Sequence, residues 1–547
     1  DVHEQFNVEV CPVTIPMGKG AAFRGIINVL TGKAYETTDG TEKEIPVPAE
    51  YTEELSRARE ILAGAAAEGD EDLLVKFIDE AGLSNEDMKF GLRLAIQDNR
   101  IVPAFCGSAV TGSGLSSLLD FITGIVPPPA GALESLVSDD ETKSTVKIDP
   151  AAPLSALVLK TSNDQFSGKL SYLKVITGKL TADTEVFNVT ENKKEKVGKL
   201  YRAIGKKLVD TRELSAGDVG VAAKMPFAKT NDTLAASSDI VPFVPLRTPN
   251  PVYSMAVSAG DKKDEDKLGE LLTRACEEDM TLKFAYNGET RQSVLSGMGD
   301  LHISIVLNRI KAQTKMDIQT VVPRIAYRET VQRKAQAEYT HKKQSGGHGQ
   351  YARVVLSIEA LERGAEYSFT NAVFGGAISK GYIPGVEKGV KEAMENGVLA
   401  GYPVVDVGVS VLDGKEHPVD SSEMAFKIAS RNAFRDAMRS AGPILLEPIM
   451  SLTVYVDMNY LGDIMSDLSG RRGHILGQAS LGGGIEEIRA QVPHQELLKY
   501  AIDLRSMTSG TGSFEMTFDH YSPISGKIAD EVIAAAKEFI KQQAEDD

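Results

Sequence analysis

The fold is decided first by residues 252–321, which read VYSMAVSAGDKKDEDKLGELLTRACEEDMTLKFAYNGETRQSVLSGMGDLHISIVLNRIKAQTKMDIQTV. The hydrophobic pattern of this stretch predicts the order strand, helix, strand, strand, helix, strand. The predicted elements are Val252–Val257, Lys262–Cys276, Leu282–Tyr286, Gln292–Leu295, Leu301–Thr314 and Met316–Val321. This order is typical of a ferredoxin-like β-α-β-β-α-β domain.

Residues 450–519 repeat this order of elements without repeating the sequence. The predicted elements are Ser451–Val456, Tyr460–Leu468, Gly473–Leu476, Ile485–Gln491, Gln495–Leu504 and Gly512–Phe518. We therefore expect a second ferredoxin-like domain. The region between the two domains mixes strands with helices, and a last helix closes the chain. These elements are Tyr351–Ile358, Gly385–Asn396, Val404–Leu412, Met424–Ser440 and about Ile528–Gln543.

The region before residue 250 has a different character. Residues 151–238 hold five or more short strand-like runs separated by turn residues, which predicts a β-barrel. Residues 46–100 read as helical, and a strand over Ile101–Cys106 and a helix over Ser113–Thr123 follow. This succession is typical of an α/β domain. Residues 130–150 are polar and are predicted to be a linker.

Composition limits the class of protein. The 547 residues are 42% hydrophobic and 25% charged, as in folded multidomain proteins. No run approaches ~20 apolar residues, so we expect no membrane span. Three scattered cysteines indicate a reducing, cytoplasmic location. Because the chain opens with Asp1, we also expect it to be a fragment.

Charge is distributed unevenly along the chain. The formal net charge of −17, from 60 basic and 77 acidic residues, would by itself disfavour nucleic acid as a partner. Residues 1–126, however, contribute −11, from 10 basic and 21 acidic residues. Residues 324–443 contribute +2, from 16 basic and 14 acidic residues. The overall charge is therefore an average over unlike domains.

The motifs of common catalytic sites are absent from the sequence. No window fits the phosphate-binding G-x-x-x-x-G-K-[ST] loop, and neither H-E-x-x-H nor G-x-S-x-G occurs. The eight histidines form no metal-binding spacing. We therefore assign no catalytic residue and no metal site within these residues.

Two polar loops are candidate nucleic-acid contacts. The first reads QSGGHGQY, and its candidate residues are Gln344, Ser345, Gly346, Gly347, His348 and Gln350. Its glycines allow close approach of a phosphate backbone, although, from the residues alone, a hairpin loop that needs positive φ angles is the favoured explanation. The second is Lys415–Glu423, in which Asp420 or Ser421 is expected to cap the following helix. His417 lies in an exposed turn, where it could stack on a base or hydrogen-bond to it.

Several long motifs resemble bacterial elongation factor G, a translational GTPase. They are VPAFCGSA (102–109), SGMGDLHISIVLNRIK (296–311), QSGGHGQY (344–351), GYIPGVEKGVKEAMENGVLAGYPVVDV (381–407), HPVDSSEMAFKIA (417–429), LLEPIM (445–450), LSGRRGHILG (468–477) and DLRSMTSGTGSFEMTFDHY (503–521). The motifs stand in the family's order and span nearly the whole chain. The resemblance is to the translocase itself, here N-terminally truncated, or to a divergent paralogue of it.

The resemblance implies a multidomain α+β and β fold with five parts. Residues 1–126 would be the C-terminal part of an α/β GTPase domain with its inserted subdomain, and 149–238 the β-barrel domain II. Residues 245–323 and 444–519 would be the ferredoxin-like domains III and V. Between them, 324–443 with 520–547 would form the elongated domain IV, the arm that reaches the decoding site.

The resemblance also implies a function and a set of sites. The intact protein would be a ribosome-stimulated GTPase that moves tRNA and mRNA, working as a monomer with both ribosomal subunits and without membranes. Candidate decoding-site residues are those of the two polar loops: Gln344, Ser345, Gly346, Gly347, His348, Gln350, His417, Asp420 and Ser421. Arg471, Arg472 and Arg505 would contact rRNA, although a salt-bridged helix end is the alternative for the arginine pair.

The nucleotide site would be present only in part. GTP or GDP and Mg²⁺ would bind the intact protein, and only Ser108 and Ala109 would contribute here, at the guanine base. We therefore expect residues 1–547 to bind no nucleotide and to be inactive in GTP hydrolysis. Two other functions remain open: a paralogue that acts in ribosome recycling, and a ribosome-binding module that needs no nucleotide.

Overall fold

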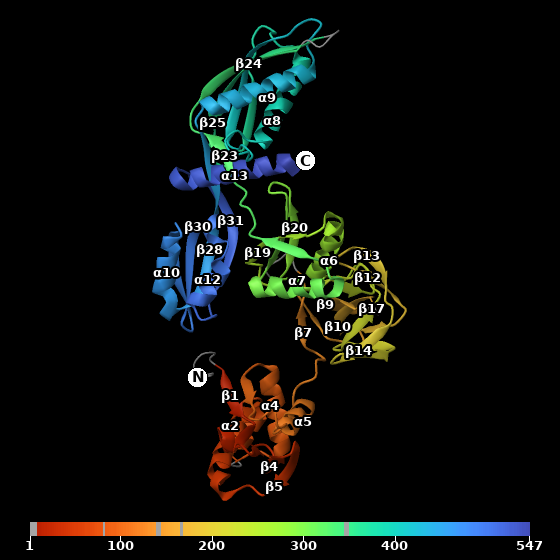
Figure 1. The fold of residues 1–547 in the computed structure, drawn as a ribbon. Coiled ribbons are helices and arrows are strands. Elements are labelled where there is room, and N and C mark those ends of the chain that lie inside the picture. Colours follow the sequence, from red (N-terminus) through yellow and green to blue (C-terminus); the bar gives the residue numbers. More distant parts are fainter. Residues whose placement is uncertain (1–7, 80–81, 138–143, 165–167, 344–348, 547) are drawn as a thin grey trace. The chain divides into compact units, whose positions relative to one another are not determined.

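The computed structural model describes residues 8–79, 82–137, 144–164, 168–343 and 349–546 (Figure 1). The chain divides into two compact units. The first comprises residues 1–158, 172–227 and 232–244, and the second comprises 159–171, 228–231 and 245–547. Within the described ranges, no helix combines the length and apolar character needed to cross a membrane.

The N-terminal part of the first unit is an α/β structure. Strand β1 (Glu9–Pro12) pairs in parallel with β6 (Ile101–Ala104). An antiparallel sheet has the order β2 (Thr14–Met17), β3 (Gly25–Asn28), β4 (Lys33–Thr38), β5 (Thr41–Ile45). The helices are α2 (Thr52–Ala67), α3 (Glu71–Asp79), α4 (Asn85–Gln97) and α5 (Leu115–Gly124). The predicted helices are confirmed, whereas strands β2 to β5 were not predicted.

The predicted linker over 130–150 is wrong in part. Strands β7 (Leu133–Ser135) and β8 (Thr145–Lys147) form an antiparallel pair, and Leu136 forms a bridge to Phe243. Each strand has only three residues, so no hydrophobic alternation is long enough to reveal it in the sequence.

The region predicted to be a β-barrel contains an eight-stranded sheet and a separate two-stranded sheet. The strands are β9 (Ser155–Asp164), β10 (Gly168–Thr177), β11 (Lys179–Thr181), β12 (Glu185–Asn188), β13 (Lys193–Lys196), β14 (Leu200–Ile204), β15 (Lys207–Thr211), β16 (Glu213–Ser215), β17 (Val219–Ala223) and β18 (Thr233–Ala235). The larger sheet has the order β13-β12-β18-β9-β10-β17-β14-β15, and β11 pairs with β16. Strands β13 and β15 are the two edges of this order, and no backbone pairing among the described residues joins them.

Both predicted ferredoxin-like folds are confirmed in the second unit. The first contains β19 (Tyr253–Ala259), α6 (Glu265–Glu278), β20 (Lys283–Asn287), β21 (Gln292–Gly297), α7 (Asp300–Thr314) and β22 (Ile318–Val321). Its sheet order, β20-β21-β19-β22, places the first and third strands in the middle. Apolar side chains of both helices pack on this sheet, Leu272 and Ile303 among them.

The second ferredoxin-like fold has the same arrangement. It contains β28 (Pro443–Asp457), α10 (Leu461–Gly470), β29 (His474–Gly482), β30 (Ile485–Pro493), α11 (His494–Leu497), α12 (Tyr500–Met507) and β31 (Ser513–Ile524). The central strand β28 pairs with both β30 and β31 and, near its start, with β23 (Arg328–Val331). The two folds therefore share a topology although their sequences differ.

The region between them is an α/β layer structure. Its sheet has the order β24 (Ala335–Lys343), β25 (Gln350–Ala360), β27 (Val407–Lys415), β26 (Tyr367–Asn371). Helix α9 (Glu423–Ser440) packs on this sheet, and α8 (Ile383–Glu395) packs beside α9 (Figure 1). Gly389 permits that close approach, because a Cβ there would lie 2.1 Å from the carbonyl oxygen of Lys427.

The last helix, α13 (Gly526–Asp546), is longer than the predicted one. Its residues Ala529 and Ala536 share an apolar cluster with Ile325 and Ala400, which lie in the region between the two ferredoxin-like folds. The C-terminal helix therefore packs against residues from the start of that region and from the segment around Ala400.

Candidate nucleic-acid interface

Three connections leave one end of the four-stranded α/β sheet. Lys343 at the end of β24 pairs with Gln350 at the start of β25, and Lys415 at the end of β27 pairs with Arg353. Strand β26 runs parallel to β27 and ends opposite Val411. The described residues next to these strand ends, 349, 372–382 and 416–422, therefore converge. We call this end the tip and define it by the described residues 342, 343, 349–351, 371–382 and 415–423.

Asp420 and Ser421 join two of these connections. The Gly349 amide donates to Asp420 Oδ1 at 2.9 Å, and the Tyr351 amide donates to the Asp420 carbonyl at 2.8 Å. The Ser421 hydroxyl donates to the Tyr351 carbonyl at 2.7 Å. These three hydrogen bonds hold the 416–422 loop against the start of β25.

The structure brings together only part of the predicted decoding-site set. Gln344, Ser345, Gly346, Gly347 and His348 lie outside the described residues, so their role stays a prediction. Gln350 faces across the hairpin, where its Oε1 lies 2.9 Å from His341 Nε2. Gly349, which carries one of the joining amides, was not among the predicted site residues.

The imidazole of His417 is held in one orientation by its own loop. Nδ1 accepts hydrogen bonds from the amides of Val419 and Asp420, at 3.3 and 3.2 Å. A nitrogen that accepts carries no proton, so in the neutral ring the proton is on Nε2. The side chain is 50% exposed, and no described residue bonds to Nε2. The ring therefore presents an N–H donor to a ligand.

The expected helix cap is wrong by one or two residues. Ser422, rather than Asp420 or Ser421, precedes α9, and its hydroxyl accepts from the Ala425 amide at 3.2 Å. Asp420 and Ser421 are instead used within the tip, as described above. Runs of short polar residues before a helix offer several possible caps, and the loop geometry selects among them.

The third connection is tied to the second by residues that sequence reasoning missed. The Ser379 amide and hydroxyl donate to the two carboxylate oxygens of Glu416, at 2.9 and 2.8 Å. The Tyr382 hydroxyl donates to the Ser421 carbonyl at 3.3 Å. Glu416 lies in a polar turn that looks simply solvated in the sequence, so no local signal marks this contact.

The tip carries several lysine side chains whose positive charge is not paired with a carboxylate in the described part of the chain. The four exposed lysines of the tip are Lys342, Lys343, Lys380 and Lys415. None of them forms an ion pair with a described residue. Arg353, by contrast, pairs with Glu338 at 2.7 Å and with Asp413 at 3.3 Å. The four lysine ammonium groups are thus available to a polyanion.

The three arginines predicted to contact rRNA differ in how many hydrogen bonds they make to other groups of this protein. Arg471 bonds to Asp467 and Asp503, and Arg472 forms a bidentate pair with Glu447. Burial alone would lower the pKa of Arg471, but these carboxylates raise it; hydrogen bonding to Glu447 raises the pKa of Arg472.

Arg505 is the most open of the three, because its exposed side chain donates to a single carbonyl, that of Met298, at 2.9 Å within the described residues. An rRNA contact stays a prediction for all three, and Arg505 has the geometry that best permits it.

Ser108 and Ala109, the residues predicted to meet the guanine base, differ in whether their backbone amides are already hydrogen-bonded. Ser108 donates its amide to the Ser113 carbonyl at 3.0 Å, whereas the amide of the exposed Ala109 bonds to no described residue. No group of three His, Cys, Asp or Glu side chains in the described part is placed to hold a metal ion. A contact of Ser108 and Ala109 with a guanine base stays a prediction.

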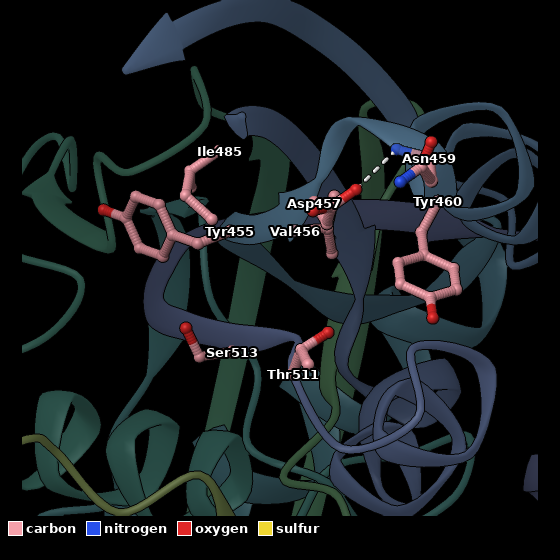
Figure 2. Close-up of a pocket in the computed structure, with 8 residues that line it drawn as sticks. All are labelled: Tyr455, Val456, Asp457, Asn459, Tyr460, Ile485, Thr511 and Ser513. Atoms are coloured by element: carbon pink, nitrogen blue, oxygen red, sulfur yellow. Dashed lines mark hydrogen bonds between the residues drawn. The ribbon is translucent and has the colours of Figure 1, made fainter. Parts of the chain in front are cut away.

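A separate pocket of about 400 Å³ lies at one end of the second ferredoxin-like sheet (Figure 2). It is lined by Tyr455, Val456, Asp457, Asn459, Tyr460, Ile485, Thr511 and Ser513. Its single carboxylate, that of Asp457, accepts from the Asn459 amide at 2.9 Å, as the dashed line in Figure 2 shows. None of the predicted site residues lines this pocket.

Comparison with known proteins covers most of the chain. Four family models match: elongation factor G domain 2 over residues 153–237, domain III over 248–321, domain IV over 323–442 and the C-terminus over 444–532. A crystal structure from Thermus thermophilus is similar at 32% identity and a TM-score of 0.82, covering 98% of this chain and 78% of that chain. The resemblance and fold class predicted from the motifs are confirmed, and the chain belongs to the elongation factor G family.

Proposed function

We propose that this translation elongation factor moves tRNA and mRNA through the ribosome in a GTP-dependent step, with the tip placed beside the anticodon and the mRNA. The observation that carries the proposal is the orientation of His417. Two backbone amides hold its Nδ1 as an acceptor, so Nε2–H faces outward. A donor fixed in this way loses little conformational freedom when it binds an RNA acceptor.

The tip combines the two kinds of contact that RNA recognition needs. Lysine ammonium groups at Lys342, Lys343, Lys380 and Lys415 would bind phosphates and supply a salt-dependent attraction without sequence preference. His417 Nε2–H would add a directional hydrogen bond to a phosphate, a base or a 2′-hydroxyl. Because Asp420 and Ser421 fix the loop, both contacts would move as one rigid body with the sheet.

The proposal predicts that His417→Ala slows movement of tRNA and mRNA by the intact protein. Loss of one directional hydrogen bond, worth about 1.5–2.5 kcal/mol, corresponds to a roughly 10- to 70-fold lower rate constant. The ribosome-stimulated GTPase rate should stay within about twofold. Rapid-kinetic measurement of mRNA movement with a fluorescent reporter gives the first quantity, and phosphate release gives the second.

His520→Ala is the matched control for that experiment. His520 lies on β31 with a side chain 48% exposed and 3.4 Å from Asp519, much as His417 is 50% exposed and 3.4 Å from Asp420. The control variant should translocate normally. Unchanged movement with His417→Ala, or equal slowing in both variants, would contradict the assignment of the tip.

GTP dependence is proposed for the intact protein only. The sequence contains no G-x-x-x-x-G-K-[ST] window, and of the residues proposed to meet the nucleotide only Ser108 and Ala109, at the guanine base, belong to it. We therefore expect residues 1–547 to show no binding in a titration with fluorescent GTP up to high micromolar concentrations and no ribosome-stimulated hydrolysis. Micromolar affinity would show that other residues hold the phosphates.

A further inference from the structure

Phe374 is an aromatic side chain that the fold does not use. It is 94% exposed, and its ring makes no aromatic contact within the described residues. It lies in the third connection of the tip, three residues after Asn371 ends β26. Burying a phenylalanine normally stabilises a protein, so a ring left almost wholly in water is available to a partner.

The backbone on both sides of Phe374 is fixed. Before it, the Ala372 amide donates to the Val411 carbonyl at 2.9 Å, and the Val373 amide donates to Asn371 Oδ1 at 3.1 Å. After it, Ser379 is held by the two oxygens of Glu416. The connection that carries the ring is therefore anchored at both ends, to β27 through Ala372 and to the 416–422 loop through Ser379.

The residues that follow Phe374 leave room for a close ligand. Gly375 and Gly376 have φ angles of 69° and 75°, in the left-handed region, and a Cβ on either would have no heavy atom within 4 Å. This backbone can approach a sugar–phosphate chain without a side chain in between.

We propose that Phe374 stacks on an unpaired RNA base when the tip is bound to the ribosome, an inference that rests on the proposed function. Lys380 lies in the same connection as the ring and Lys415 lies at the end of β27, and neither lysine has an ion-pair partner among the described residues. Aromatic rings set among basic groups are typical of sites for unpaired RNA, in which the ring stacks and the cations bind phosphates. A protein partner would instead favour a contiguous apolar core around the ring; the other large apolar side chain exposed among the described tip residues is Val419, and the remaining exposed groups there are mostly polar or basic.

Three substitutions test the proposal in the intact protein. Phe374→Ala removes the ring, Phe374→Leu keeps apolar area without a π-face, and Phe374→Tyr keeps the π-face. We expect Ala and Leu to weaken binding to ribosomes carrying tRNA by about 5- to 100-fold and Tyr to change it by less than about twofold. Thermal unfolding of all three variants should match that of the wild type, because the ring is exposed.

The outcomes separate this inference from the proposed function. Wild-type affinity in the Leu variant alone would indicate an apolar contact with protein and overturn the stacking. Wild-type affinity in all three variants would also overturn it, while leaving the proposed function intact. If the wild-type protein itself fails to bind ribosomes, the proposed function fails, and the inference fails with it. As a direct check, p-benzoylphenylalanine in place of Phe374 should crosslink to RNA; crosslinking solely to ribosomal protein would contradict the proposal.

Discussion

Glu329→Gln is expected to loosen the region between the two ferredoxin-like folds strongly. Glu329 on β23 is fully buried, and its carboxylate accepts four backbone amides, those of Val398, Leu399, Ala400 and Tyr402, at 2.7 to 3.1 Å. The side-chain amide of glutamine would point N–H groups at two of those donors. Two buried donors would lose their acceptor, at a cost of roughly 3 kcal/mol or more.

The effect should be measured locally, because a multidomain chain does not unfold in one transition. Amide hydrogen exchange at residues 398–402 should speed up by about 100-fold or more in the variant, as roughly 3 kcal/mol implies. The matched control is Glu359→Gln, in which the carboxylate pairs with Lys334 at the surface. It should leave exchange at 398–402 unchanged, and slow exchange in the Glu329 variant would contradict the assigned role.

The long helices of the region between the two ferredoxin-like folds could be predicted from the sequence, because their hydrophobic residues recur regularly. Helix α9 buries Ala425, Ala429, Ala433 and Ala437 at one residue in four, and it begins one residue before the predicted start. Strand β24 was missed although its residues alternate. Its inward side chains, such as Ala335 and Ala337, are small and only half-buried, so the hydrophobic signal is weak.

The contacts that shape the site could not be predicted, because they join residues far apart in the chain. Glu329 meets its donors about 70 residues later, and Ser379 meets Glu416 37 residues later. No local pattern carries such information. The sequence did place His417, Asp420 and Ser421 in one loop, but only the folded geometry shows that Asp420 and Ser421 position the loop that presents the His417 ring.

Because Asp420 positions the loop that presents His417, the second large loss of translocation rate is expected for Asp420→Ala. Asp420 Oδ1 accepts the Gly349 amide at 2.9 Å, and Oδ2 lies 3.4 Å from His417 Nδ1. Alanine removes the bond between the Asp420 carboxylate and the Gly349 amide, whereas the backbone bond from Tyr351 and the bond from the Ser421 hydroxyl to the Tyr351 carbonyl remain. A hydrogen bond to a carboxylate is worth about 1.5–3 kcal/mol. If the order of the 416–422 loop is needed while tRNA and mRNA move, translocation should slow by roughly 10- to 150-fold.

Asp420→Asn is the matched control, because its side-chain oxygen can still accept the Gly349 amide. It should keep most of the rate, and thermal unfolding of both variants should resemble that of the wild type, since the loop is at the surface. Equal slowing by Asn and Ala would mean that the negative charge, rather than the hydrogen bond, is needed. A wild-type rate in the Ala variant would mean that the two bonds of Tyr351, with the Asp420 carbonyl and with the Ser421 hydroxyl, suffice to order the tip, and that the orientation of His417 does not depend on this carboxylate.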